Sequence, residues 1–139
     1  MNESEIAQSD QLDLLRNALD QQRRSVRCFE LLLATAGKDD KQILSSMQRE
    51  DRRHYYLLEG IYEEIGGQEY RPPRLSVAMP RQFVSMLQAM IKNKLDAISL
   101  YEKLEEALNC VKQKELLAIV ISDQKEQSRL LAEIYNRSV

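Results

Sequence analysis

The sequence predicts an all-α protein, a four-helix bundle made of two antiparallel helical hairpins. Glycine and proline are scarce, with 4 and 3 copies in 139 residues, so the chain has few places to turn. Apolar residues recur at alternating steps of three and four, which is the spacing of one face of a helix. The turn-forming residues gather in a few places and leave four long segments between them, one for each helix.

The helix ends are predicted from capping residues. Ser9 or Asp10 can cap the start of the first helix, and Asp39 or Asp40 can cap the start of the second. Gly37 and Gly66 can end the first and second helices in the left-handed conformation. The four predicted helices cover residues 10–36, 40–65, 81–108 and 112–137.

The connections between these helices define the topology. Short turns join the first helix to the second and the third to the fourth, which favours two antiparallel hairpins. The connection over residues 66–80 contains three prolines and, extended at about 3.3 Å per residue, reaches roughly 50 Å. It is therefore predicted to cross the length of the bundle. Residues 1–9 are expected to form a flexible N-terminus, and residues 10–139 a single domain.

Composition excludes several classes of protein. Hydrophobic residues are 43% and charged residues 30% of the chain, with a net charge of −2, so nucleic acid is not an expected partner. No apolar run approaches the roughly 18 residues of a membrane span, and the N-terminus does not resemble a signal peptide. Cys28 and Cys110 are too few for a disulfide framework. We therefore expect a cytoplasmic protein that does not bind membranes.

The two predicted hairpins are similar in sequence. "QQRRSVRCFELL" aligns with "NKLDAISLYEKL", and "EDRRHYYLLEGIY" aligns with "DQKEQSRLLAEIY". The two alignments have almost the same offset along the chain, which indicates a duplicated helical hairpin.

Polar residues interrupt the apolar stripe of each helix near its middle. Because the interruptions lie at similar heights, they are expected to meet in one layer inside the bundle. Burying polar groups costs several kcal/mol unless they find partners, so such a layer needs a reason. The interrupting residues are Gln22 in the first helix, Asp51 and His54 in the second, Lys94 in the third, and Gln124 and Gln127 in the fourth.

The spacing of these six residues resembles that of the di-iron ligands in the ferritin-like superfamily, rubrerythrin-like branch. "EDRRHYYLLEGIYEEIGG" resembles a D-E-x-x-H helix, "KNKLDAISLYEKL" a D-E-x-x-A-x-x-x-Y helix, and "SDQKEQSRLL" a D-E-x-x-H-x-x-L-L helix. The resemblance covers about residues 10–137. It implies the ferritin-like fold, with one long crossover, and a homodimer formed through helix faces.

Most of the ligand identities differ from the family pattern. Gln22, Asp51, Lys94 and Gln124 stand where the resemblance implies Glu, and Gln127 stands where it implies a second His. Two divalent ions would bring a charge of +4, whereas Asp51 and Lys94 sum to zero. The layer is therefore interpreted as a vestigial di-iron centre with no cofactor, in which the ammonium group of Lys94 pairs with Asp51. Asp51 and His54 are the weak candidates for a metal.

Three functions remain open on this reading. The first is a non-catalytic interaction or scaffold protein, expected to form a homodimer, whose protein partner is unknown. The alternative is a rubrerythrin-like oxidoreductase or iron-handling protein with an altered centre that holds iron or another divalent metal. That centre would use Asp51 and His54, with Glu50, Asp123 or Glu126 brought inward. A third reading is a carrier of a small ligand among the glutamine side chains.

Overall fold

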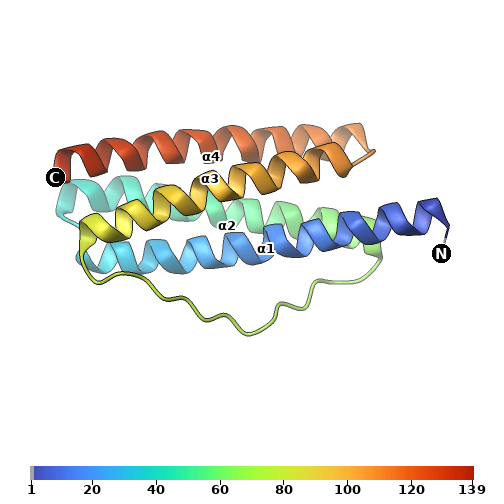
Figure 1. Cartoon of the computed structure of the whole chain (residues 1–139), viewed down its shortest axis with the longest axis horizontal. Coiled ribbons are helices and arrows are strands. Elements are labelled where there is room, and N and C mark those ends of the chain that lie inside the picture. The colour runs from blue at the N-terminus through green and yellow to red at the C-terminus, as the bar shows by residue number, and fades with distance from the viewer. Residues whose placement is uncertain (1) are drawn as a thin grey trace.

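The computed structural model describes residues 2–139, and over this range all regular structure is helical (Figure 1). The four helices are α1 (Glu3–Thr35), α2 (Lys38–Gly66), α3 (Phe83–Ala107) and α4 (Val111–Ser138). The predicted all-α four-helix bundle is confirmed. None of these helices has an apolar stretch long enough to cross a lipid bilayer.

The helix ends differ from the prediction at the start of α1 and at both ends of α2. Helix α1 begins at Glu3 rather than at residue 10, because the side chain of Asn2 accepts a hydrogen bond from the amide of Glu5 at 2.8 Å and caps it. At the end of α2 the left-handed residue is Gly67, with φ of 71°, and its amide donates to the carbonyl of Glu63 at 2.8 Å. Gly37 has φ of −71° and is the N-cap of α2, so its predicted left-handed role is wrong. The predicted cap at Asp39 or Asp40 is wrong too, because both residues lie within the first turn of α2 and no side chain of residues 2–139 caps the start of that helix.

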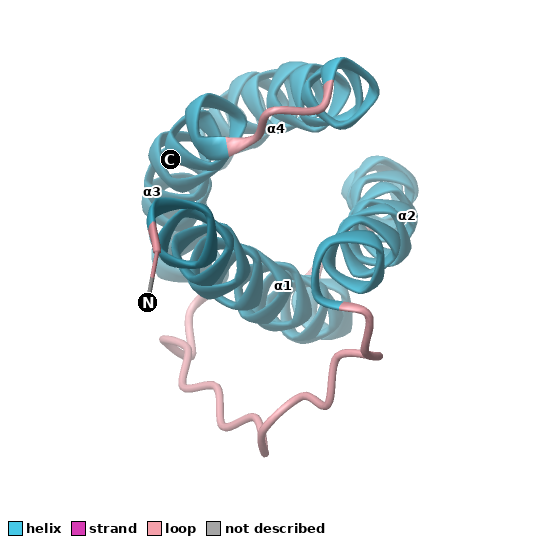
Figure 2. Cartoon of the chain, turned by 90° about the vertical axis from the view of Figure 1, so that its right-hand side faces the viewer, coloured by secondary structure: helices cyan, strands magenta, loops and turns pink. Residues whose placement is uncertain are grey.

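The order of the helices in space matches two hairpins joined by a crossover. Helices α1 and α2 form one antiparallel pair and α3 and α4 the other, and the segment between α2 and α3 runs outside the bundle along its length (Figure 1). Figure 2 shows α2 and α4 standing further apart than α1 and α2 do. Helices α2 and α4 are therefore packed less closely than the other neighbouring pairs.

The apolar core is divided into two clusters, one toward each end of the bundle. Each fully buried leucine or isoleucine in them contributes about 1.5–3 kcal/mol of burial free energy. The polar layer lies between the two clusters. One cluster includes Leu15, Leu19, Leu58, Ile61, Tyr101, Leu104 and Leu117, and the other includes Phe29, Leu32, Leu44, Met47, Leu87, Met90 and Leu131.

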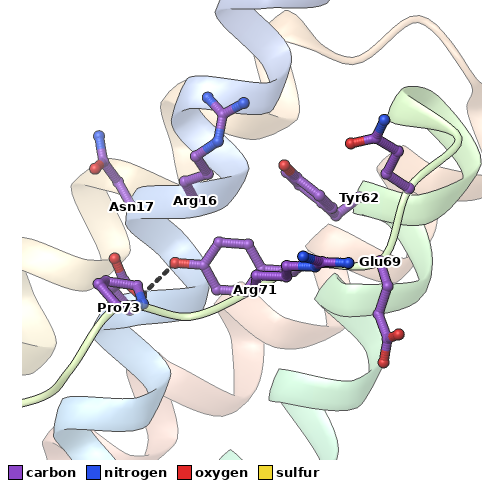
Figure 3. Close-up of a pocket in the computed structure, with 9 residues that line it drawn as sticks. Arg16, Asn17, Tyr62, Glu69, Arg71 and Pro73 are labelled. Carbon is purple, nitrogen blue, oxygen red and sulfur yellow. Dashed lines mark hydrogen bonds between the residues drawn. The ribbon is translucent and has the colours of Figure 1, made fainter.

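The crossover is attached to the bundle by Tyr70, which is only 6% exposed. Its hydroxyl donates to Oδ1 of Asp20 at 2.6 Å, the dashed line in Figure 3, and its ring lies edge-on to Tyr62 with centroids 5.3 Å apart. Burial and the carboxylate of Asp20 both raise the pKa of Tyr70, so the hydroxyl keeps its proton.

The open cavity of about 860 Å³ beside Tyr70 has Arg16 and Arg71 in its wall together with Asp20 and Glu69. Its charges are balanced, and it does not reach the polar layer.

We expect Tyr70→Phe to lower the free energy of unfolding by about 1–2 kcal/mol, because it removes a hydrogen bond to a charged acceptor while keeping the ring. Urea denaturation followed by circular dichroism measures the change. Tyr56→Phe is the matched control, since Tyr56 is 69% exposed. Equal stability of the two variants would show that the Tyr70 hydroxyl does not hold the crossover.

Candidate functional site

The structure buries all six residues of the predicted polar layer. They come from all four helices and lie between the two apolar clusters, in the middle of the bundle. Their exposed fractions are 0% for Gln22, Asp51 and Gln124, 1% for Gln127, 2% for Lys94 and 3% for His54.

Lys94 lies at the centre of this layer. Its Nζ donates to Oδ2 of Asp51 at 2.6 Å, to Oγ of Ser25 at 2.8 Å and to Oε1 of Gln124 at 2.9 Å. An ammonium group has three hydrogens, so all of them are used. Burial lowers the pKa of Lys94, whereas the charge and hydrogen bond of Asp51 act to raise it. The ion pair predicted between Lys94 and Asp51 is present.

Asp51 is the acceptor on which the layer converges. Besides Lys94, it accepts hydrogen bonds from Ser25 Oγ at 2.5 Å, Gln124 Nε2 at 2.8 Å and Gln127 Nε2 at 3.0 Å. Burial alone would raise the pKa of Asp51, but the charge of Lys94 and the hydrogen bonds outweigh it and hold the pKa below its usual range. Asp51 is therefore an anion, and it neutralises Lys94.

Two features of the layer differ from the sequence-based expectation. Gln22 does not join the Lys94 network, since its Nε2 donates to the hydroxyl of Tyr101 at 2.9 Å. Ser25, which was not predicted, takes part in its place. The signal was available, because α2 and α4 each supply a pair of polar residues three apart, and Gln22 and Ser25 repeat that spacing on α1.

A second polar group lies against the outer side of the layer, between α2 and α4. Glu50, His54 and Asp123 each offer one possible metal-ligating atom, and these atoms lie within 4.8 Å of one another. Nε2 of His54 is 2.8 Å from Oδ2 of Asp123, and Nε2 of Gln127 donates to Oε1 of Glu50 at 2.9 Å. We call these three residues the outer cluster.

The outer cluster is reachable from solvent. The side chains of Glu50 and Asp123 are 28% and 34% exposed, whereas that of His54 is buried. A groove of about 400 Å³ between α2 and α4 has Met47, Glu50 and Gln127 in its wall. A small ion could approach Glu50 along this groove without disturbing the core.

The prediction that the protein has no cofactor is wrong, because it depended on the charges of the six layer residues alone, whereas Glu50 and Asp123, which the alternative prediction named, lie beside His54. The structure brings His54 together with the carboxylates of Glu50 and Asp123. Each of these two acids comes one residue before a layer residue, Asp51 or Gln124, and so lies beside the predicted apolar stripe. Asp51, the other weak candidate, is turned toward Lys94 and is not in this group. Glu126 pairs at the surface with Arg129 at 2.6 Å, so it is not brought inward.

The ring of His54 connects the layer with the outer cluster. Its Nδ1 faces Nε2 of Gln124 at 3.2 Å, and its Nε2 faces Asp123. Burial lowers the pKa of His54, but hydrogen bonding and the charges of Asp51 and Asp123 outweigh it, and the net shift is upward.

Comparison with known proteins identifies the fold. No protein-family model matches the chain, and no curated protein matches it in sequence. Among solved structures, a "ferritin like, diiron-carboxylate" protein from Bacillus anthracis str. Ames has a TM-score of 0.84 at 20% identity, covering 97% of this chain and 99% of the other. A hypothetical protein from Pyrococcus furiosus has a TM-score of 0.80 at 17% identity, covering 91% and 88%.

A third similar structure is the bacterioferritin of Desulfovibrio desulfuricans, a protein with a diiron site. It has a TM-score of 0.80 at 12% identity, covering 98% of this chain and 84% of the other. The chain therefore has the fold of the ferritin-like superfamily, as the sequence predicted.

We expect Lys94→Met to lower the free energy of unfolding by about 3–5 kcal/mol, because it leaves Asp51 buried without its counter-charge. Asp51→Asn in the same chain should recover part of the loss, so the two changes are less than additive. Chemical denaturation of the four proteins of this cycle measures the coupling. Lys92→Met, at an exposed neighbouring position, is the control. Additive losses would mean that the ion pair contributes no coupling.

The Lys94→Met change should also alter the dependence of stability on pH. In the native protein the folded pKa of Asp51 is below the unfolded value of about 3.9, so its contribution is present above that value and is lost as pH falls through the folded pKa. Without Lys94, burial acts unopposed by the ammonium and raises the folded pKa of Asp51. The variant should then gain stability relative to wild type as pH falls from about 7 to about 4.5. Thermal melts across this range test it, and a constant gap would contradict it.

Proposed function

We propose that this protein is a ferritin-like, iron-handling bundle that binds a single divalent metal ion on Glu50, His54 and Asp123. On this proposal the centre of the bundle holds no metal pair, because the ammonium group of Lys94 occupies it. The observation that carries the proposal is the convergence of the three ligating atoms within 4.8 Å, with one of the three residues, Glu50, in the wall of an accessible groove.

The residues of the polar layer do not fit two metal ions. Lys94 and Asp51 already neutralise each other, and the layer's amide side chains carry no charge. Two divalent ions would add a charge of +4 beside an ammonium in a site of low dielectric constant, which is strongly unfavourable.

The outer cluster does fit one divalent ion. Glu50 and Asp123 together bring a charge of −2, and neutral His54 adds an imidazole nitrogen. Imidazole with carboxylate oxygens suits iron, manganese and zinc, which bind such atoms at about 2.0–2.2 Å. Three protein ligands leave open positions, and a bound iron ion would supply Lewis-acid and one-electron chemistry there.

The residues around the cluster would orient its ligands. Gln127 donates to Oε1 of Glu50 at 2.9 Å and so fixes one carboxylate. Asp51 Oδ1 lies 3.6 Å from Nδ1 of His54, on the side of the ring away from Asp123. Such outer partners set the direction of metal ligands. Two of the similar structures are of diiron proteins, which supports iron as the metal of first choice.

The interaction or scaffold role, the homodimer and the placement in the rubrerythrin-like branch stay predictions. Large exposed hydrophobic side chains are spread over the four helices, with Ile6 on α1, Tyr56 on α2, Leu95 on α3 and Ile119 on α4. Scattered residues of this kind are normal on a monomer and identify no partner surface.

Anaerobic titration with Fe(II) should show one bound ion per chain, and calorimetry with Zn(II) should give the same stoichiometry. Glu50→Gln and Asp123→Asn each remove one charged ligand, so each should weaken binding by at least about tenfold. Glu126→Gln is the matched control, since it removes a carboxylate beside the same groove. Two ions per chain, or equal losses in all three variants, would contradict the single outer site.

A further inference from the structure

The orientation of the Gln124 amide is fixed by its neighbours. Its Oε1 accepts from Nζ of Lys94 at 2.9 Å, and its Nε2 donates to Oδ1 of Asp51 at 2.8 Å. Lys94 can only donate and ionised Asp51 can only accept. Turning the amide over would place an NH₂ group against the ammonium and an oxygen against the carboxylate. The observed orientation is therefore the one that the ion pair requires.

This orientation determines where the ring of His54 carries its hydrogen. One hydrogen of Gln124 Nε2 goes to Asp51, and the other faces Nδ1 of His54 across 3.2 Å. A donor opposite Nδ1 requires a lone pair on that nitrogen. In the neutral ring the hydrogen is then on Nε2, and it is donated to Oδ2 of Asp123 at 2.8 Å.

We propose that Lys94 and Gln124 are positioning residues that hold His54 in the Nε2–H tautomer and thereby lower the affinity of the outer cluster for metal. This inference rests on the proposed function, since it concerns the affinity of the same site. Nε2 is the nitrogen that faces Asp123, and a metal ion can bind it only through its lone pair. The hydrogen on Nε2 occupies that position in the metal-free protein.

Metal binding then requires a defined rearrangement. The proton leaves Nε2, the metal–nitrogen bond forms there, and Nδ1 takes up one proton, so the ring stays neutral. The Gln124 hydrogen bond to Nδ1 is lost. Asp51 Oδ1, 3.6 Å from Nδ1, becomes the acceptor of the new N–H group after a small shift. Because Oδ1 already accepts from Gln124 and Gln127, this shift works against the resting network.

His54 is the only histidine in the sequence, so ¹⁵N-histidine labelling gives the spectrum of one imidazole ring. At a pH at which the ¹⁵N shifts show a neutral ring, the metal-free protein should show the Nε2–H tautomer. Saturation with Zn²⁺ should move the hydrogen to Nδ1 and place zinc on Nε2. A metal-free ring with hydrogen on Nδ1, or zinc on Nδ1, would overturn the proposal.

Gln124→Glu tests the positioning role. A carboxylate at this position removes the hydrogen that faces Nδ1 and places a second anionic oxygen beside Oδ1 of Asp51, so Nδ1 should carry the hydrogen in the metal-free ring and the affinity for Zn²⁺ should rise about tenfold or more. Gln88→Glu makes the same chemical change at the α3 surface, where Gln88 contacts Tyr135, and should alter neither quantity. An unchanged tautomer in folded Gln124→Glu protein would refute the role of Gln124.

The two proposals fail in different ways. If wild-type protein shows the Nε2–H tautomer but binds no Zn²⁺ or Fe(II), the proposed function fails, and with it the claim that the tautomer governs a metal site. If metal binds with the expected stoichiometry but the metal-free ring is already Nδ1–H, the function stands and the positioning role of Lys94 and Gln124 is refuted. The wild-type spectrum needs no variant, so the test does not depend on any substitution folding.

Discussion

The buried ion pair of Lys94 and Asp51 is the constraint on which the centre of this bundle depends. Removing two charges from water costs several kcal/mol per ion, and their attraction offsets this only when the remaining hydrogen-bonding groups are satisfied. Ser25 and Gln124 meet this requirement for Lys94, at 2.8 and 2.9 Å. These four residues come from four different helices, so a single hydrogen-bond network fixes the position of each helix along the bundle axis relative to the other three. An apolar layer would allow a helix to shift by a turn, whereas this network defines the register.

The outer cluster follows from the same pair. Asp51 directs its carboxylate to Lys94 and the glutamines, and His54 therefore directs one ring nitrogen toward the layer and the other toward Asp123. The carboxylates that remain available to a cation lie between α2 and α4, the less closely packed pair (Figure 2). The outer cluster and the polar layer are thus adjacent, and His54 belongs to both.

Sequence periodicity predicted the bundle and the height of its polar layer because both depend on which side chains face the axis. Gly37 was assigned wrongly because glycine is compatible with several backbone conformations and sequence alone does not choose among them. Ser25 was missed because the apolar stripe continues beside it through Val26, although Ser25 repeats the three-residue spacing of the polar pairs on α2 and α4.

The metal prediction failed for a different physical reason. Helical spacing assigns each residue to a line on the helix surface, but the carboxylate of Glu50 lies several bonds from its backbone and reaches the edge of the layer from a neighbouring line. Charge counting over the six layer residues was sound for those residues. It omitted Glu50 and Asp123, whose charges matter because they lie within contact of His54.

The two hairpins, whose sequences align, are chemically unequal in the polar layer, and the hydrogen bonds show where. Lys94 corresponds to Gln22 in the repeat, and the three hydrogens of its ammonium group all have acceptors. Within the described chain, Oε1 of Gln22 and Oε1 of Gln127 are buried without a hydrogen-bond partner. Each such oxygen costs about 1–3 kcal/mol relative to a satisfied one. One ammonium group therefore makes the layer neutral in charge but leaves it two donors short, and the shortage falls on the residues that Lys94 does not contact.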